Sequence, residues 1–314
     1  MAEIILRTEN LTKKYDDLIA VNRLNLEISE GEVFGLLGPN GAGKTTTILM
    51  LLGLTEPYFG KATIYGCDCT RDPIGVKRIV GYLPDNVAFY NDMTGRENMR
   101  FVGEMNGLDQ RRCEERIDML LERVNMTKAA DKKVKTYSKG MRQRLGIADV
   151  LMKDPKVVIL DEPTLGIDPE GMHELLDLIV ELSQKDRRTV LISSHQLYQI
   201  QQICDRVGIF VKGKLIACGS IDTLNKAVQG KETMTFEFAA KPNDEALEKL
   251  ILSVPGVEGI KKEQELYIVR ARCDVRNALA GAALGKGYML QHIRQHGADL
   301  DDIYRQYFSK EVAV

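Results

Sequence analysis

The chain has 314 residues, of which 44% are hydrophobic, and its 43 basic and 45 acidic residues give a net charge of −2. This length suits about two domains with buried cores, and the balanced charge argues against a nucleic-acid partner. No apolar run approaches the ~18 residues of a membrane span, and Glu3 and Arg7 interrupt the N-terminus. We therefore expect neither a spanning helix nor a signal peptide. The six cysteines lack zinc-site spacing and fit reduced thiols in a cytosolic protein.

A glycine-rich motif lies between a predicted strand and a predicted helix. Residues 38–46 match the P-loop pattern G-x-x-x-x-G-K-[ST] at each constrained position. The apolar run at 32–37 favours a buried strand, and 45–54 favours a helix. Backbone N–H groups of such a loop surround phosphate oxygens, and the helix N-terminus points its positive end at the same anion. The residues expected to bind phosphates are Gly38, Pro39, Asn40, Gly41, Ala42, Gly43, Lys44, Thr45 and Thr46.

Three side chains in this half of the chain are candidates for closer roles. Lys44 is expected to reach the β- and γ-phosphates of a nucleotide, and the Thr45 hydroxyl is expected to ligate Mg²⁺. Residues 78–83 predict a strand that ends at Pro84-Asp85. Ligands of α/β proteins bind beyond the strand ends, so Asp85 is a candidate to hold Mg²⁺ or to orient water. A turn-forming aspartate is the alternative.

Residues 86–151 are predicted to be mostly helical, because apolar residues recur at three- and four-residue spacing over 98–105, 111–124 and 141–152. The stretch 87–93 places two aromatic residues and a methionine in a loop. A partner surface and ordinary packing explain that stretch equally well. Further on, Ser138 and a glycine stand directly before a helix, which fits an N-cap and also an anion site.

An acidic pair follows the apolar run at 157–160. This run predicts a buried parallel strand, so Asp161 and Glu162 lie at its carboxyl end and face the phosphate site. Asp161 suits the Mg²⁺-holding role of a Walker-B aspartate, and Glu162 is placed to act as the base on an attacking water. The apolar strand at 189–194 ends at His195, which we expect to contact the γ-phosphate.

These motifs, with the loop at 165–168, occur in the order found in ATP-binding-cassette (ABC) ATPases. The chain resembles that nucleotide-binding domain over residues 1 to about 220. It is most similar to the single-domain ATPase subunits of bacterial ABC exporters of the ABC-2 kind. The resemblance implies a P-loop NTPase fold with a helical subdomain at about 86–151, ATP and Mg²⁺ as ligands, and ATP hydrolysis as the activity.

The resemblance also implies roles for several residues. Tyr15 would stack on the base, and His195 would be the switch histidine. Ser138 and Gly140 would touch the γ-phosphate of ATP bound to a partner subunit, with Lys139 beside them. Asp168 would organise the dimer contact.

Two departures from the family pattern stand out. The usual signature Leu-Ser-Gly-Gly-Gln is altered by Tyr137, Lys139 and Met141. Methionine cannot make the hydrogen bonds of glutamine, and we expect Lys139 to offset this with a charge near phosphate. The glutamine that usually follows the strand at 78–83 is Asp85 here, which puts a water-positioning role in doubt.

The pattern changes beyond residue 220. Strands are predicted at 234–238, 256–261, 265–270 and 288–293, with helices at 243–252 and 275–284. That order, β-α-β-β-α-β, is ferredoxin-like. A closing helix is predicted at 299–308. The spacing of His292 and His296 would suit a metal on a helix, but the stretch favours a strand and a turn.

The sequence therefore predicts two domains, an ABC ATPase domain at 1–225 and an accessory α+β domain at 226–314. We expect ATP to close a dimer of two ATPase subunits that drives a separate polytopic membrane permease from the cytoplasmic face of the membrane. The alternative is a soluble ABC ATPase acting on ribosomes, DNA or a cluster-assembly complex. A P-loop kinase is disfavoured by residues 137–141 and Glu162.

Overall fold

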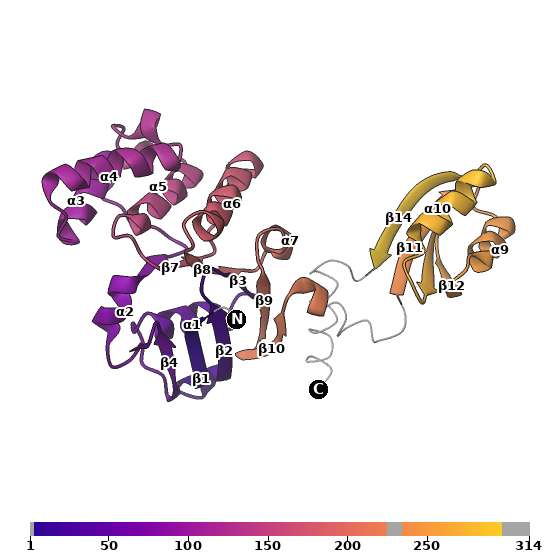
Figure 1. Cartoon of the computed structure of the whole chain (residues 1–314), viewed down its shortest axis with the longest axis horizontal. Helices are drawn as coiled ribbons and strands as arrows, with labels where there is room; N and C mark the ends of the chain where they lie inside the picture. The colour runs from indigo at the N-terminus through magenta and orange to yellow at the C-terminus, as the bar shows by residue number, and fades with distance from the viewer. Residues whose placement is uncertain (1–2, 225–233, 297–314) are drawn as a thin grey trace. The chain divides into compact units, whose positions relative to one another are not determined.

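The structure is a computed structural model that describes residues 3–224 and 234–296. The chain forms two compact units, Met1–Cys218 and Gly219–Val314, which are drawn in Figure 1. The domain boundary predicted at 225/226 and the closing helix predicted at 299–308 lie outside the described residues.

A six-stranded sheet in the first unit carries the predicted motifs, with the strand order β10-β9-β3-β8-β7-β6. Its neighbouring strands from β9 to β6 run parallel. Every residue of β3, β7 and β8 is buried, which explains their unbroken apolar runs. The strands are β3 Val33–Leu37, β6 Val80–Leu83, β7 Val157–Asp161, β8 Thr189–Ser194, β9 Arg206–Val211 and β10 Lys214–Gly219.

A second sheet of the same unit is antiparallel, with the order β2-β1-β4-β5. Its strands are β1 Ile4–Tyr15, β2 Leu18–Ser29, β4 Phe59–Ile64 and β5 Cys67–Asp68. One core cluster joins residues of both sheets with Ile48 of α1 (Lys44–Leu51), the helix that follows the glycine-rich loop. The turn between β1 and β2 is short. Tyr15 pairs with Leu18, so only Asp16 and Asp17 form the turn.

Further helices of this unit are α2 Pro73–Ile79, α3 Gly95–Met105, α4 Gln110–Arg123, α5 Lys139–Leu151, α6 Pro169–Gln184 and α7 Leu197–Gln201. Helices α3, α4 and α5 form a group beyond the sheets (Figure 1). Their predicted spans are confirmed, but each begins one to three residues earlier than predicted. The reason is capping: Thr94, Asp109 and Ser138 accept hydrogen bonds from backbone N–H groups of the first turns, ahead of the apolar pattern.

The second unit confirms the predicted β-α-β-β-α-β order. Its four strands form an antiparallel sheet with the order β12-β13-β11-β14, around a core that includes Phe236, Phe238 and Tyr267. Its elements are β11 Met234–Lys241, α9 Glu245–Ser253, β12 Val257–Glu263, β13 Leu266–Ala271, α10 Arg276–Gly285 and β14 Met289–His296. His292 lies in a strand, as predicted, and its Nε2 is 3.0 Å from Glu237 Oε2.

Candidate active site

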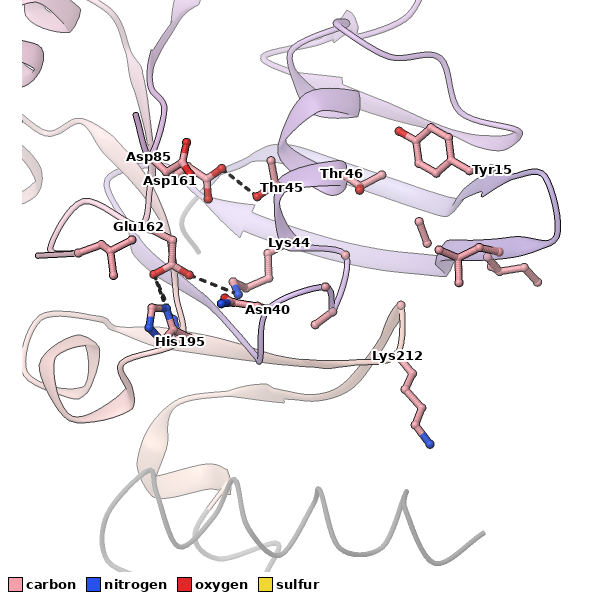
Figure 2. Close-up of a pocket in the computed structure, with 18 residues that line it drawn as sticks. Tyr15, Asn40, Lys44, Thr45, Thr46, Asp85, Asp161, Glu162, His195 and Lys212 are labelled. Carbon is pink, nitrogen blue, oxygen red and sulfur yellow. Dashed lines mark hydrogen bonds and ion pairs between the residues drawn. The ribbon is translucent and has the colours of Figure 1, made fainter. Parts of the chain in front are cut away.

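A pocket of about 710 Å³ opens above the carboxyl ends of β3 and β7. It brings together predicted residues from widely separated parts of the chain (Figure 2). The predicted residues in its lining are Tyr15, Asn40, Gly41, Ala42, Gly43, Lys44, Thr45, Thr46, Asp85, Asp161, Glu162 and His195. Gly38 and Pro39 lie just below, where their carbonyl oxygens accept hydrogen bonds from Lys44.

The backbone conformation of the loop before α1 requires glycine. Gly43 caps the N-terminus of α1 with a φ of 107°, a left-handed conformation that L side chains rarely adopt. A Cβ atom at Gly43 would also lie 2.3 Å from the Ala20 carbonyl oxygen. The unpaired N–H groups of the first α1 turn therefore point into the pocket, where they favour an anion.

Lys44 lies at the base of the pocket and is 5% exposed. Its ammonium donates hydrogen bonds to the carbonyl oxygens of Gly38 (2.7 Å) and Pro39 (3.2 Å). It is also 3.4 Å from Glu162 Oε1. A buried cation is costly without such partners, so these contacts hold the charge in place below the loop.

Asp161 is held by two hydroxyl groups. Thr45 Oγ1 donates to Asp161 Oδ2 at 2.9 Å, and Ser193 Oγ donates to Asp161 Oδ1. Burial raises the pKa of Asp161, and the two hydroxyl hydrogen bonds oppose that shift. Burial, helped by the carboxylates of Asp161 and Asp85, also raises the pKa of Tyr82 to about 12. The site thus gathers oxygen atoms of the kind that hard divalent cations bind.

Sequence analysis missed Ser193. Its position in β8 lies opposite Asp161 of β7 in the parallel register. Its hydroxyl also accepts a hydrogen bond from the Glu162 N–H at 3.2 Å. The signal in the sequence was a pair of serines at the end of an apolar run, directly before His195.

Glu162 connects the base of the pocket to its rim. Its Oε2 lies 2.8 Å from His195 Nδ1, while its Oε1 faces Lys44. Glu162 has a φ of 48°, which is uncommon for a residue with a side chain. The turn it makes directs its carboxylate into the pocket rather than along the strand.

The other end of the pocket is apolar and open. Tyr15 is 44% exposed there, beside the exposed side chains of Leu18 and Ile19. The hairpin turn at Lys212 and Gly213 completes this end, and the Gly213 N–H donates to the Ala42 carbonyl oxygen at 2.9 Å. Sequence analysis did not single out Leu18, Ile19 or Lys212, because exposed residues in hairpins carry no distinctive spacing.

Ser138, Lys139 and Gly140 are not part of the pocket. They form the N-terminus of α5, where Ser138 Oγ accepts a hydrogen bond from the Met141 N–H at 3.3 Å. Ser138 and Lys139 are exposed. A single chain therefore does not bring this turn to its own phosphate loop.

A parallel sheet with a P-loop before α1 and an acidic pair at the end of a neighbouring buried strand defines a P-loop NTPase of the ATP-binding-cassette class. A family model described as ABC transporter matches residues 21–165. The ABC transporter ATP-binding protein YxlF of Bacillus subtilis is 37% identical over 302 residues, covering 96% of this chain and 98% of YxlF. The chain belongs to the family of ABC transporter ATP-binding proteins. It binds and hydrolyses ATP as a subunit of an ABC transporter.

Two further comparisons agree with this. The bacitracin transport ATP-binding protein BcrA of Bacillus licheniformis is 40% identical over 222 residues, covering 71% of this chain and 72% of BcrA. The solved structure of cbiO1 from Clostridium perfringens, part of the ABC transporter complex cbiONQ, is 30% identical with a TM-score of 0.64. That match covers 81% of this chain and 96% of cbiO1.

Proposed function

We propose that ATP lies along the pocket with its base on Tyr15 and its phosphates in the loop 38–46. The apolar end and the anion-binding end of the pocket support this orientation. Lys44 would contact the β- and γ-phosphates, and the α1 N–H groups would bind the β-phosphate oxygens. We take residues 1–225 as the ATPase domain and 226–314 as an accessory domain.

We propose Mg²⁺ as the cofactor of this site. Thr45, Asp161 and Asp85 supply a hydroxyl and two carboxylates at one end of the phosphate loop, and such oxygen donors fit a hard cation. Bound Mg²⁺ would neutralise phosphate charge in the transition state. The hydroxyls of Thr45 and Ser193 hold Asp161 in place for this role.

Glu162 is the proposed general base. One oxygen of its carboxylate forms an ion pair with Lys44, and the other is hydrogen-bonded to His195. That position lies between the phosphate-binding cation and the pocket rim, where a water molecule could attack in line. His195 would orient Glu162 and contact the γ-phosphate.

We propose that two ATPase subunits close around two ATP molecules. This proposal rests on the observation that the exposed turn Ser138–Gly140 is separate from the pocket of its own chain. A second copy would present that turn, with the Lys139 ammonium, to the γ-phosphate. No helix among the described residues is long and apolar enough to cross a membrane.

We further propose that the dimer drives a separate polytopic permease from the cytoplasmic face of the membrane. An exposed apolar group on the helical part supports this contact: Tyr90 is 57%, Phe101 37% and Met105 74% exposed. The Tyr90 and Phe101 rings pack edge to face, with centroids 5.1 Å apart. The similarity to BcrA, a bacitracin transport ATP-binding protein, supports a transporter of the exporter kind.

The test is Glu162→Gln. It keeps the shape of the side chain and leaves Asp161 intact, so ATP should bind while hydrolysis falls about 10²- to 10⁴-fold. Trapped ATP should stabilise the dimer by mass action. The variant should elute as a dimer with Mg-ATP and as a monomer without nucleotide. A variant that stays monomeric at saturating Mg-ATP would contradict the two-site arrangement.

A further inference from the structure

Lys139 rests on a loop that follows the catalytic strand. A Cβ atom built on Gly166 would lie 2.9 Å from Lys139 Nζ, 3.1 Å from its Cδ and 3.4 Å from its Cε. The first two distances are closer than ordinary packing contacts, so the end of the Lys139 side chain, with its Nζ, occupies the space beside the α-carbon of Gly166. The φ of Gly166, +72°, independently favours glycine at this position.

Neighbouring contacts join the same two segments. A Cβ atom on Gly140 would lie 3.4 Å from Ile167 Cγ2, in ordinary contact. One turn further along α5, Arg144 Nη2 forms an ion pair of 2.6 Å with Glu174 of α6. The N-terminal half of α5 therefore packs against the loop 165–168 and the helix that follows it.

The loop 165–168 follows closely after Glu162, the proposed base. The Leu165 N–H donates to the Glu162 carbonyl oxygen at 3.2 Å, and the Ile167 N–H donates to the Thr164 carbonyl oxygen at 3.3 Å. These turn hydrogen bonds link backbone groups within the segment from Glu162 to Ile167. A displacement at Glu162 would thus be carried to Gly166 and from there to Lys139.

The Lys139 ammonium makes no hydrogen bond or ion pair within residues 3–224 and 234–296. The side chain lies against Gly166, and its charge has no hydrogen-bond or ion-pair partner among these residues. The side chain can therefore have two roles, a packing contact within its own chain and a charge that is available to a group across the interface.

We propose that Lys139 is a positioning residue that links the turn Ser138–Gly140 to the loop 162–168 through the Gly166 contact. The turn that one chain offers to its partner's ATP then moves with the loop that carries its own Glu162. The two ATP sites of the dimer would hydrolyse cooperatively for this reason. This inference rests on the two-subunit arrangement proposed above.

The test compares Lys139→Met with Lys139→Ala in the full chain. Methionine keeps an unbranched stem against Gly166 without the charge, whereas alanine removes both. We would measure kcat, KM and the Hill coefficient for ATP hydrolysis, with Lys132→Ala, an exposed lysine upstream of the turn, as the control. With two sites the wild-type Hill coefficient is bounded by about 2.

Both variants should lose about tenfold or more in kcat, because both lose the charge. Lys139→Met should keep the wild-type Hill coefficient, and Lys139→Ala should fall to about 1. Lys132→Ala should match the wild type. A wild-type Hill coefficient in Lys139→Ala, or an equal fall of the Hill coefficient in Lys139→Met and Lys139→Ala, would overturn the link alone. A noncooperative wild type together with a monomeric Glu162→Gln variant would overturn the two-site mechanism as well.

Discussion

Glu162 and His195 form a hydrogen bond of 2.8 Å between Oε2 and Nδ1, and the His195 N–H lies 3.4 Å from the same oxygen. The residues come from the ends of adjacent strands, β7 and β8. Since Glu162 Oε1 faces Lys44 at 3.4 Å, His195 is the group that fixes the orientation of the carboxylate from the rim side.

His195→Ala should therefore slow hydrolysis without abolishing ATP binding. The variant frees Oε2 and removes the proposed γ-phosphate contact, so kcat should fall about 10²-fold or more. Steady-state ATPase assays and equilibrium binding of a fluorescent ATP analogue separate the two effects. Wild-type turnover in this variant would contradict the prediction and show that other groups orient Glu162.

Lys44→Ala should abolish measurable turnover. It removes the buried cation at the base of the phosphate loop, and loss of such a charge costs about 3 kcal/mol or more in the transition state. Lys61→Ala, which removes an exposed lysine paired with Glu9 on the antiparallel sheet, is the matched control. Normal hydrolysis by Lys44→Ala would refute the assignment of this loop.

Asp149 gives a prediction for stability. It lies in α5, its Oδ1 is buried without a hydrogen-bond partner among the described residues, and burial raises its pKa to about 7. The charge of Lys153 partly opposes this shift, and the Lys153 ammonium donates a hydrogen bond to the Lys77 carbonyl oxygen at 2.7 Å. The folded state therefore holds the proton more tightly than the unfolded state, and the associated stability disappears as the pH rises through about 7.

Asp149→Asn should consequently stabilise the protein most at pH 8, and less as the pH falls from 7 towards 4. With about 1.4 kcal/mol for each pKa unit, the gain at pH 8 has an upper limit of about 4 kcal/mol. Urea unfolding of both proteins at pH 8 and pH 5 measures the difference. An equal difference at the two pH values would show that Asp149 keeps an ordinary pKa.

Removal of residues 226–314 should leave ATP binding intact. The described residues that line the pocket all belong to the first unit, so the accessory domain should act on assembly with the partner subunits. Isothermal titration with ATP of the truncated and full-length proteins compares their affinities. A soluble, folded truncation that no longer binds ATP would place part of the site beyond residue 225.

Sequence analysis located most of the pocket because most of the residues that bind or react there belong to short motifs with a recognisable pattern. The apolar runs before Asp161 and His195 are buried strands, and parallel strands bring their carboxyl ends to one edge. The roles assigned to these side chains remain predictions, although their proximity is now a structural observation.

Other features could not be predicted because they depend on register and packing. Ser193 reaches Asp161 only through the pairing of β7 with β8. The contact between Lys139 and Gly166 joins residues whose spacing carries no signal, and it is set by how α5 packs on the loop before α6. Helix starts were also placed late, because Thr94 and Asp109 extend α3 and α4 beyond the apolar pattern.

The position of β8 in the sheet has a consequence for biosynthesis. It lies between β3, which leads to Lys44, and β7, which leads to Glu162. These two strands are therefore joined only when residues 189–194 have paired with both. During synthesis from the N-terminus, a nascent chain that has just completed Glu162 already contains the phosphate loop but not the strand that unites the two. We therefore expect hydrolytic competence to arise late in synthesis, after the long-range pairing of residues 189–194 with both strands.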